Sequence, residues 1–270
     1  MTKGPIDLAS ARILVTNDDG IHAPGLKVLE RVARSFSRDV WTVAPEVEQS
    51  GASHALTTLR PLRIRRFGPR RYAIDGTPTD CVLVALHRVV TGRPPDLVLS
   101  GINQGGNLGE DVTYSGTVAA ALEAALLGVP AVAFSQLRAA DAPMFWDTCE
   151  RFAPEVLRAL ASITWPPDLL FNVNFPPVPP ERVTGIRACH QGRRQSSVEI
   201  IDGEDPHGRP YVWIGDFSSH HSEHAESDLR AVADGAISVT PLHLDMTHRA
   251  TLENLPVLLA LETAGGEVRP

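Results

Sequence analysis

Two adjacent carboxylates directly follow a short apolar run near the start of the chain. The aliphatic residues 13–15 lead into Asn17, Asp18, Asp19 and Gly20. Such a short run is typical of a buried strand, and Asn, Asp and Gly tolerate a sharp turn at its end. Two like charges side by side repel each other, so the pair calls for a cation. Oxygen ligands favour Mg²⁺, Mn²⁺ or Ca²⁺. The alternative interpretation is an ordinary surface turn.

The apolar pattern beyond this turn alternates between helices and strands. Apolar residues recur on one face of a helix over 26–36, and residues 40–44 form a second strand that Pro45 ends. Strand, helix and strand at this spacing form a βαβ unit, which favours a parallel sheet. The sequence therefore predicts an α/β fold with a mostly parallel sheet flanked by helices. Further strands are expected at 96–100, 131–135, 169–175 and 237–242, and helices at 77–90, 118–127 and 145–160.

Other oxygen donors follow the next strands of the predicted sheet. Ser50 lies in the loop after the second strand, and Asn103 lies in a glycine-rich segment, 101–109, after the strand at 96–100. In an open parallel sheet, ligands bind at the carboxyl ends of the strands. We therefore expect these two side chains to share one edge of the sheet with Asp18 and Asp19.

A helix that begins beside this edge offers an anion site. Ser115, Gly116 and Thr117 open the alanine-rich helix 118–127. Small residues at a helix start leave backbone N–H groups accessible at its positive end, which suits a phosphate. Both hydroxyls can also act as ordinary helix caps, and capping is compatible with anion binding. The preceding loop has neither the Walker nor the dinucleotide-binding pattern.

A metal beside a phosphate site predicts phosphoryl chemistry, with the metal as a Lewis acid that activates water. The nearest mechanistic alternative is a phosphatase of the haloacid-dehalogenase type, in which the first Asp of an Asp-x-Asp-Gly motif becomes an aspartyl phosphate. This chain has Asn17 in that place, and an amide cannot serve as that nucleophile. Direct attack by water is the better inference. A nucleotide-binding regulator without turnover is the second alternative.

Composition limits the other function classes. The 270 residues are 43% hydrophobic and 21% charged, and the net charge of −7 argues against a stable nucleic-acid partner. No apolar stretch is long enough for a membrane span, and the N-terminus lacks the order of a signal peptide. Three scattered cysteines, Cys81, Cys149 and Cys189, favour reduced thiols. A cytoplasmic protein without a membrane partner is expected.

The chain divides near residue 140, where its pattern changes. Residues 11–140 are predicted to form the metal- and phosphate-binding core. Residues 141–270 are predicted to complete the sheet and to add a hairpin at about 186–217 and a C-terminal arm. Two charged segments remain: six arginines between 60 and 71, and the histidine-rich stretch 218–224. The arginines suit a protected edge strand or a patch for polyanionic substrates, and the histidines suit a solvated loop.

Five ordered motifs together resemble the SurE family of metal-dependent 5′/3′-nucleotidases. The motifs are Asn17-Asp18-Asp19-Gly20, Ser50-Gly51-Ala52-Ser53, Gly76-Thr77-Pro78-Thr79-Asp80, Ser100-Gly101-Ile102-Asn103 and Tyr114-Ser115-Gly116-Thr117. The resemblance implies a Rossmann-like core and one divalent ion per subunit, Mg²⁺ or Mn²⁺. The implied metal ligands are Asp18, Asp19, Ser50 and Asn103. The implied phosphate and substrate contacts are Asn107, Ser115, Gly116, Thr117 and Gly51.

The same resemblance implies the reaction and the assembly. The expected reaction is hydrolysis of nucleoside 5′- and 3′-monophosphates, with short-chain polyphosphate as a further substrate. Asp18, Asp19 and Asn107 are the expected catalytic residues. The general acid is open between His22, His54 and water. The family also implies a homodimer or homotetramer, in which the hairpin and the segment after Pro241 lie between subunits.

Overall fold

The alternating helices and strands assemble around one nine-stranded sheet, whose order is β3-β4-β2-β1-β5-β6-β7-β11-β8. The structure is a computed structural model that describes residues 2–139, 142–194, 198–217 and 224–259. Neighbouring strands are parallel except for the pairs β3–β4 and β7–β11. The predicted α/β class with a mostly parallel sheet is therefore confirmed.

The elements have the following bounds. The strands of the large sheet are β1 (Arg12–Thr16), β2 (Asp39–Pro45), β3 (Ile64–Gly68), β4 (Arg71–Ile74), β5 (Leu97–Gln104), β6 (Ala131–Gln136), β7 (Leu169–Phe175), β8 (Ile186–Ala188) and β11 (Ile237–His243). The helices are α1 (Pro24–Phe36), α2 (Pro78–Val84), α3 (Gly116–Leu126), α4 (Trp146–Ala161), α5 (Asp228–Ala233) and α6 (Arg249–Leu259). Short helical turns are η1 (Ala85–Val89), η2 (Gly109–Thr113) and η3 (Pro180–Arg182).

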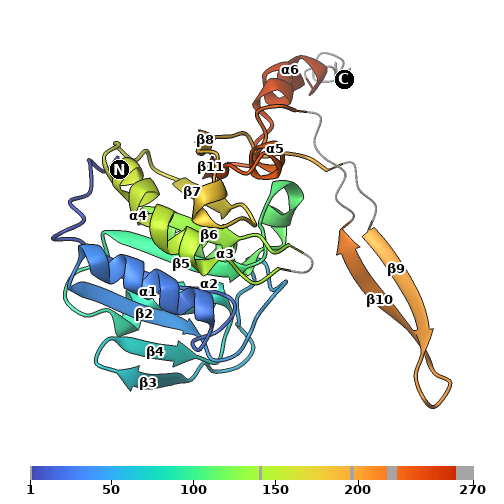
Figure 1. The fold of residues 1–270 in the computed structure, drawn as a ribbon, viewed down its shortest axis with the longest axis horizontal. Coiled ribbons are helices and arrows are strands. Elements are labelled where there is room, and N and C mark those ends of the chain that lie inside the picture. Colours follow the sequence, from blue (N-terminus) through green and yellow to red (C-terminus); the bar gives the residue numbers. More distant parts are fainter. Residues whose placement is uncertain (1, 140–141, 195–197, 218–223, 260–270) are drawn as a thin grey trace, which may run out of the picture.

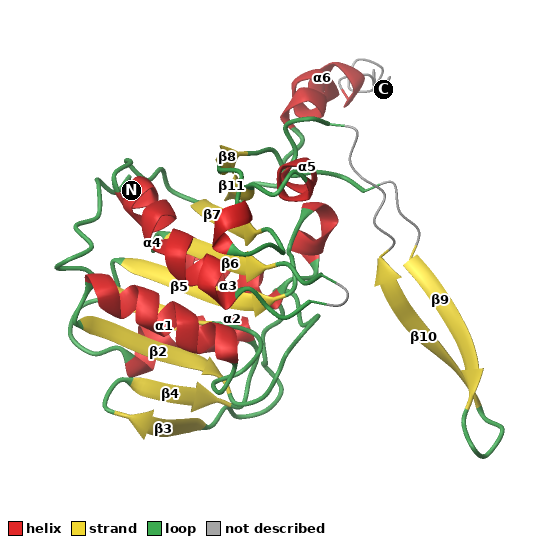
Figure 2. Ribbon diagram, in the orientation of Figure 1, coloured by secondary structure: helices red, strands yellow, loops and turns green. Residues whose placement is uncertain are grey.

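Helices cover both faces of the sheet. Side chains alternate along β1, so that Ile13 and Val15 pack with α1 and α4 in one core, whereas Leu14 packs with α2 and α3 in the other. Figure 2 shows the sheet between these helical layers. Burial on both faces explains the continuous apolar runs of the central strands.

The strand order of the sheet changes side at β1. From β1 it continues through α1 to β2 on one side, and it later returns to place β5 on the other side. Thr16 of β1 pairs in register with Ser100 of β5, so both strands end at the same edge. Such a switch point in an open α/β sheet is where ligands bind. The expected site residues follow β1 and β5 at this edge.

Two predicted elements differ from the structure. The helix expected over 77–90 is regular only to Val84 and continues as the π-helical turn η1, in which the Val90 N–H bonds to the Ala85 carbonyl. The hairpin expected over 186–217 contains fewer residues, because β8 pairs with the free edge of β11 in the large sheet. Only β9 (Val198–Glu204) and β10 (Pro210–Phe217) form the antiparallel ribbon, which Figure 1 shows standing away from the sheet.

The structure tests the remaining expectations only in part. The histidine-rich stretch lies almost entirely in residues 218–223, outside the described residues. Among the helices that the structure describes, none is long and apolar enough to cross a membrane. The division of the chain near residue 140 stays a prediction.

Candidate active site

Asp18 is the buried centre of the candidate site. Its side chain is only 4% exposed, and the Thr117 hydroxyl at the start of α3 donates a hydrogen bond to its Oδ1. Burial raises the pKa of Asp18 to about 7, the hydrogen bond from Thr117 opposes this shift, and the neighbouring charge of Asp19 adds to it. The carboxylate is therefore held in place in an environment that disfavours its negative charge.

Asp19 faces the loop after β5. Its Oδ2 accepts a hydrogen bond from the Gln104 N–H at 3.2 Å, which brings the segment with Asn103 to the acidic pair. Burial raises the pKa of Asp19, and the nearby charge of Glu48 raises it further, against the effect of the Gln104 N–H. Neither carboxylate has a basic partner within 4 Å among the residues described.

Three glycines allow the surrounding segments to come this close. A Cβ on Gly116 would lie 2.8 Å from the Asp18 Cβ, so the start of α3 packs directly on the acidic residue. A Cβ on Gly25 would lie 1.9 Å from the Ile102 carbonyl oxygen, and one on Gly101 would lie 2.3 Å from the Phe134 oxygen. A methyl group at any of these positions would push apart the elements that form the site.

Ser50 and Gly51 lie in the loop after β2. The neighbouring Gln49 N–H donates to the Asp18 carbonyl oxygen at 2.8 Å, which fixes the loop beside the acidic pair. The Ser50 side chain is exposed and donates to Glu48 Oε1 at 2.8 Å, and Gly51 adopts φ +75° in open space. The loop is thus beside Asp18, while the Ser50 hydroxyl points to a neighbouring carboxylate.

The start of α3 uses its two hydroxyls for structure. The Ser115 Oγ accepts a hydrogen bond from the Val118 N–H at 3.0 Å and caps the helix, while the Thr117 hydroxyl is bound to Asp18. The first turn of α3 contains no acidic residue. The positive end of its helix dipole therefore faces the site without a fixed negative charge on the helix itself.

Asn107 is hydrogen-bonded to β6 and β7, not to the strands that carry the acidic pair. Its Nδ2 donates to Ser135 Oγ on β6 at 2.7 Å, and its backbone N–H donates to Asn174 Oδ1 on β7 at 2.8 Å. The Asn107 carbonyl accepts from the side-chain amides of Asn172 and Asn174. Asn172 and Asn174 belong to the strand expected over 169–175 and resemble a motif of the family, but no local pattern indicates their bonds to Asn107, which lies 65 or more residues away.

The loop after Asn107 is hydrogen-bonded to residues 192–194, which precede β9 in the sequence, and to Asp228. Arg194 donates to both carboxylate oxygens of Asp111 at 2.7 Å and to the Leu108 carbonyl at 3.0 Å. The buried Asp228 accepts the N–H groups of Gly109 at 2.9 Å and Gly192 at 2.8 Å. No local pattern in the sequence indicates either bridge, because Arg194 lies 83 residues from Asp111, and Asp228 lies 119 residues from Gly109 and 36 from Gly192.

The two histidines considered as general acids have other contacts. His54 Nε2 lies 2.9 Å from Oε2 of the buried Glu123 on α3, so it anchors the loop after Ser50. His22 is exposed, and its ring meets that of Phe67 edge-on at 5.4 Å. The general acid therefore stays open.

The donor set at this edge fits a hard cation. Two carboxylates without a basic partner, an amide at Asn103 and a hydroxyl at Ser50 lie on three converging segments, and all offer oxygen. The buried Thr16 and Ser100 hydroxyls beneath them have no hydrogen-bond partner in the described part of the chain. Among the described residues, no group of three or more His, Cys, Asp or Glu side chains is placed so that it could hold a metal ion by itself, so a cation here would depend on neutral oxygens as well.

These features define a doubly wound α/β protein with an acidic pair and a helix N-terminus at its switch point. The family model for the survival protein SurE matches residues 13–198. A protein of Paramagnetospirillum magneticum named 5′-nucleotidase SurE is 54% identical over 98% of this chain and all of its own length. Another of that name, from Caulobacter vibrioides, is 50% identical over 92% of this chain and 96% of its own length.

A solved structure agrees with these matches. The SurE protein from Aquifex aeolicus superposes with a TM-score of 0.79 at 38% identity, covering 92% of this chain and 99% of the other. The chain belongs to the SurE family. The resemblance read from the motifs is confirmed at this level, together with the fold.

The Asp228 bridge gives a prediction about the loop that carries Asn107. Asp228→Asn replaces one acceptor oxygen by an amide that faces a backbone N–H, and an unsatisfied buried group costs about 1–3 kcal/mol. Hydrogen exchange of the peptides around Gly109 and Gly192 should accelerate by about tenfold or more. Asp234→Asn is the matched control, since Asp234 forms exposed ion pairs with Arg187 and Arg230. Unchanged protection of both peptides in Asp228→Asn would contradict the bridge.

Proposed function

We propose that the protein is a metal-dependent phosphomonoesterase that hydrolyses nucleoside 5′-monophosphates to nucleoside and phosphate. The proposal rests on family membership and on one contact of this chain. The Thr117 hydroxyl at the start of α3 is hydrogen-bonded to Asp18 at the end of β1. An acidic group and a helix N-terminus therefore share one edge, which suits a cation beside a phosphate.

The proposed metal ligands are Asp18, Asp19, Ser50 and Asn103. Ser50 would hold the ion through its hydroxyl, which is exposed and donates to Glu48 in the structure. When bound, one Mg²⁺ or Mn²⁺ ion supplies positive charge to the phosphate oxygens and acidity to water. The ion also offsets the repulsion between the two carboxylates.

The proposed phosphate contacts are the backbone N–H groups at the start of α3, with Gly51 and Asn107 at the rim. The hydroxyls of Ser115 and Thr117 are engaged, so the backbone and the helix dipole provide the attraction. A water molecule attacks phosphorus, a new P–O bond forms, and the ester P–O bond breaks as the leaving oxygen gains a proton. Hydrolysis of 3′-monophosphates and short polyphosphates requires only the same terminal phosphate.

The phosphoenzyme alternative is disfavoured by Asn17. Asn17 is fully buried and its Nδ2 donates to the Gly20 carbonyl at 3.0 Å, so the side chain stabilises the turn and has no nucleophilic atom. The second alternative, a nucleotide-binding regulator without turnover, shares the phosphate site. It requires no chemistry from the acidic pair, and activity measurements separate the two.

The acidic pair gives the test of the activity. Wild-type protein with AMP and Mn²⁺ should release phosphate, and EDTA should abolish the release. Asp18→Asn or Asp19→Asn should lower kcat by about a thousandfold, since either change removes charge that holds the cation. Asp147→Asn, at the exposed start of α4, is the control and should keep full activity. Near-normal turnover of both site variants at saturating Mn²⁺ would contradict the assignment.

The helix start gives a second prediction. Ser115→Asp preserves the N-cap acceptor but adds a negative charge where the phosphate is proposed to bind. KM for AMP should rise by about tenfold or more, while Mn²⁺ affinity, measured by titration calorimetry, stays nearly unchanged. Ser115→Asn also preserves the cap without charge and should resemble the wild type. Equal loss of metal and substrate binding in Ser115→Asp would mean that the two subsites are wrongly assigned.

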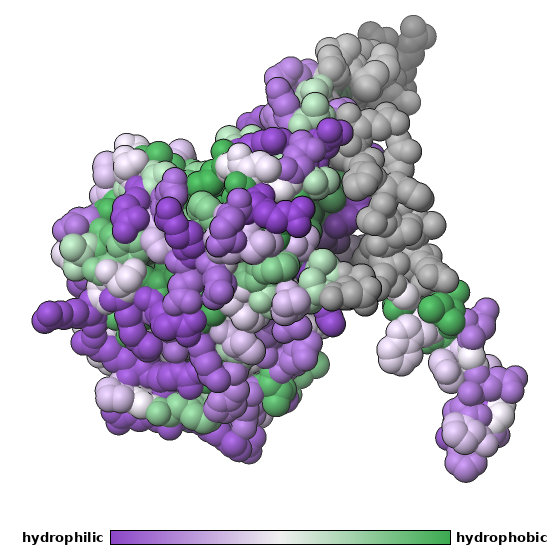
Figure 3. Space-filling model, viewed as in Figure 1, coloured by the Kyte–Doolittle hydropathy of each residue, from purple (hydrophilic) through white to green (hydrophobic). Residues whose placement is uncertain are grey.

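The β9–β10 ribbon supports a proposed homo-oligomer, a dimer or a tetramer. Six large apolar residues of the ribbon, two in β9 and four in β10, are 46% to 70% exposed in the single chain; Trp213, for example, is 66% exposed and Ile214 is 70% exposed. Figure 3 shows the ribbon outside the body of the molecule, with hydrophobic residues at one end and hydrophilic residues toward its tip. A lone two-stranded ribbon is marginally stable in water, and exposed apolar surface of this kind marks a contact surface. The ribbon, with the segment after Pro241, is the proposed interface.

Cross-strand substitution tests this interface. Ile201 and Trp213 face each other across the ribbon, and Ile201→Lys with Trp213→Lys places two charges where a neighbouring subunit would bury them. Light scattering should show an oligomer for the wild type and a smaller species for the double variant. His207→Lys, in the polar turn of the ribbon, should leave the mass unchanged. A monomeric wild type, or an unchanged double variant, would contradict the proposed interface.

A further inference from the structure

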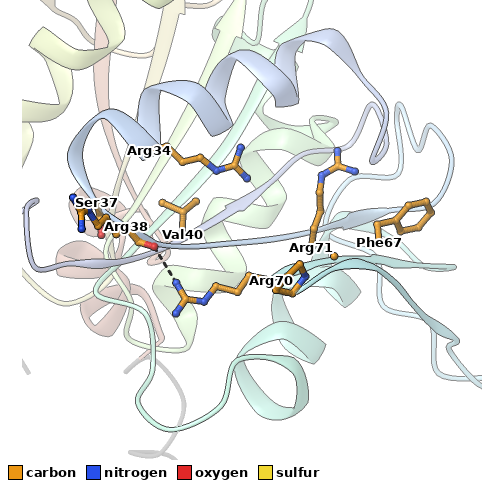
Figure 4. Close-up of a pocket in the computed structure, with 9 residues that line it drawn as sticks. Arg34, Ser37, Arg38, Val40, Phe67, Arg70 and Arg71 are labelled. Atoms are coloured by element: carbon orange, nitrogen blue, oxygen red, sulfur yellow. Dashed lines mark hydrogen bonds between the residues drawn. The ribbon is translucent and has the colours of Figure 1, made fainter.

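An open groove of about 730 Å³ lies between the end of α1 and the turn that joins β3 to β4. It is separate from the acidic pair, and neither the proposed metal ligands nor the proposed phosphate contacts line it. Figure 4 shows its side chains spread along the groove, from Arg38 at one end to Phe67 at the other. Its basic lining residues are Arg34, Arg38, Arg70 and Arg71.

The groove carries more positive than negative charge. Glu30 accepts from Arg71 at 3.0 Å and also lies 3.7 Å from Arg34, so one carboxylate serves two guanidinium groups. Asp39 pairs with Arg70 at 3.2 Å, but it also binds Arg12.

Arg38 has no carboxylate within 4 Å among the described residues, and its side chain is exposed. The groove is therefore basic on a chain whose net charge is −7. Guanidinium groups in such a setting bind phosphate oxygens strongly.

Protection of an edge strand does not explain these arginines. On the exposed edge strand β3, Arg65 pairs with Glu46, and the adjacent Arg63 lies 3.8 Å from Asp75. The groove arginines instead come from α1, from the α1–β2 connection and from the β3–β4 turn. Three separate segments thus contribute basic side chains to the lining of one groove, which suits the binding of an anion.

The end of the groove opposite Arg38 offers a flat aromatic surface. Phe67 is 46% exposed, and Figure 4 places it at the far side of Arg71, with Arg70 and Arg38 at the other end. A ligand that fits this order has a chain of negative charges at one end and an aromatic ring at the other. We propose that the groove is an accessory binding site for a nucleoside polyphosphate, with the phosphates on the arginines and the base on Phe67.

The groove is connected to the acidic turn. Arg71 donates a hydrogen bond to the carbonyl oxygen of Ile21, and Phe67 packs edge-on against His22. Ile21 and His22 lie two and three positions after Asp19 in the sequence. A ligand that draws Arg71 toward its phosphates or stacks on Phe67 therefore changes the contacts that hold this turn. The accessory site is a means of regulating the candidate active site from outside it.

Calorimetric titration of the full chain with ATP in EDTA tests this site without requiring activity. The wild type should bind one ATP, and Arg34→Glu with Arg38→Glu should raise Kd by about tenfold or more, since each change replaces attraction by repulsion. The control is a matched pair of charge reversals on exposed arginines, Arg88→Glu in η1 with Arg151→Glu in α4. It lies outside the groove lining and should leave Kd within about twofold.

Two further binding measurements identify the ligand class and the binding site. Tripolyphosphate should bind more weakly than ATP, and Phe67→Ala should remove the difference. Ser115→Asp, which blocks the proposed catalytic phosphate site, should leave ATP binding in EDTA unchanged. The proposal is overturned by absence of ATP binding, by equal weakening in both double reversals, by equal affinities for ATP and tripolyphosphate, or by loss of binding in Ser115→Asp.

Discussion

The buried carboxylate of Asp18 is the constraint on which the site depends. Taking this group out of water beside Asp19 disfavours its charge, and the Thr117 hydroxyl only partly offsets the cost. The carboxylate keeps its position because α3 begins directly upon it, with Gly116 leaving room for the contact. The turn after β1, the loop after β5 and the start of α3 therefore form one unit, in which a change at one member displaces the others.

Most of the sheet follows from local sequence. Residues 13–15 and 131–134 are continuous apolar runs, as expected for strands buried on both faces, and Thr77 with Asp80 forms the capping box that begins α2. The wrong detail was the extent of the hairpin, because residues 186–188 have no local property that distinguishes a ribbon strand from a strand that pairs with β11. Such pairing is decided by which sheet edge is free after folding, and a single segment does not contain that information.

The candidate site was predictable in its acidic and glycine-rich parts only. Asp18 stands at a strand end with turn residues around it, so its place at the sheet edge follows from the order of the chain. The contacts that hold Asn107 and its loop do not follow from chain order. Asn174, 67 residues away, accepts from the Asn107 N–H, and Arg194 donates to the Leu108 carbonyl across 86 residues. The place of Ser50 at the edge was expected from the strand it follows, whereas the role of Asn107 came from the family resemblance. The structure adds that Ser50 donates to Glu48, while Asn107 is bonded to β6 and β7.

The charges at this edge also order the events of the proposed reaction. Asp18, Asp19 and Glu48 lie close together on a chain of net charge −7, and a phosphate monoester is itself a dianion. The dipole of α3 acts only over about one helical turn, so it does not outweigh three carboxylates at longer range. A divalent cation held by Asp18 and Asp19 would offset this negative charge where the phosphate is proposed to bind. In the proposed reaction the cation would therefore bind before the phosphate, and the start of α3 would orient the phosphate.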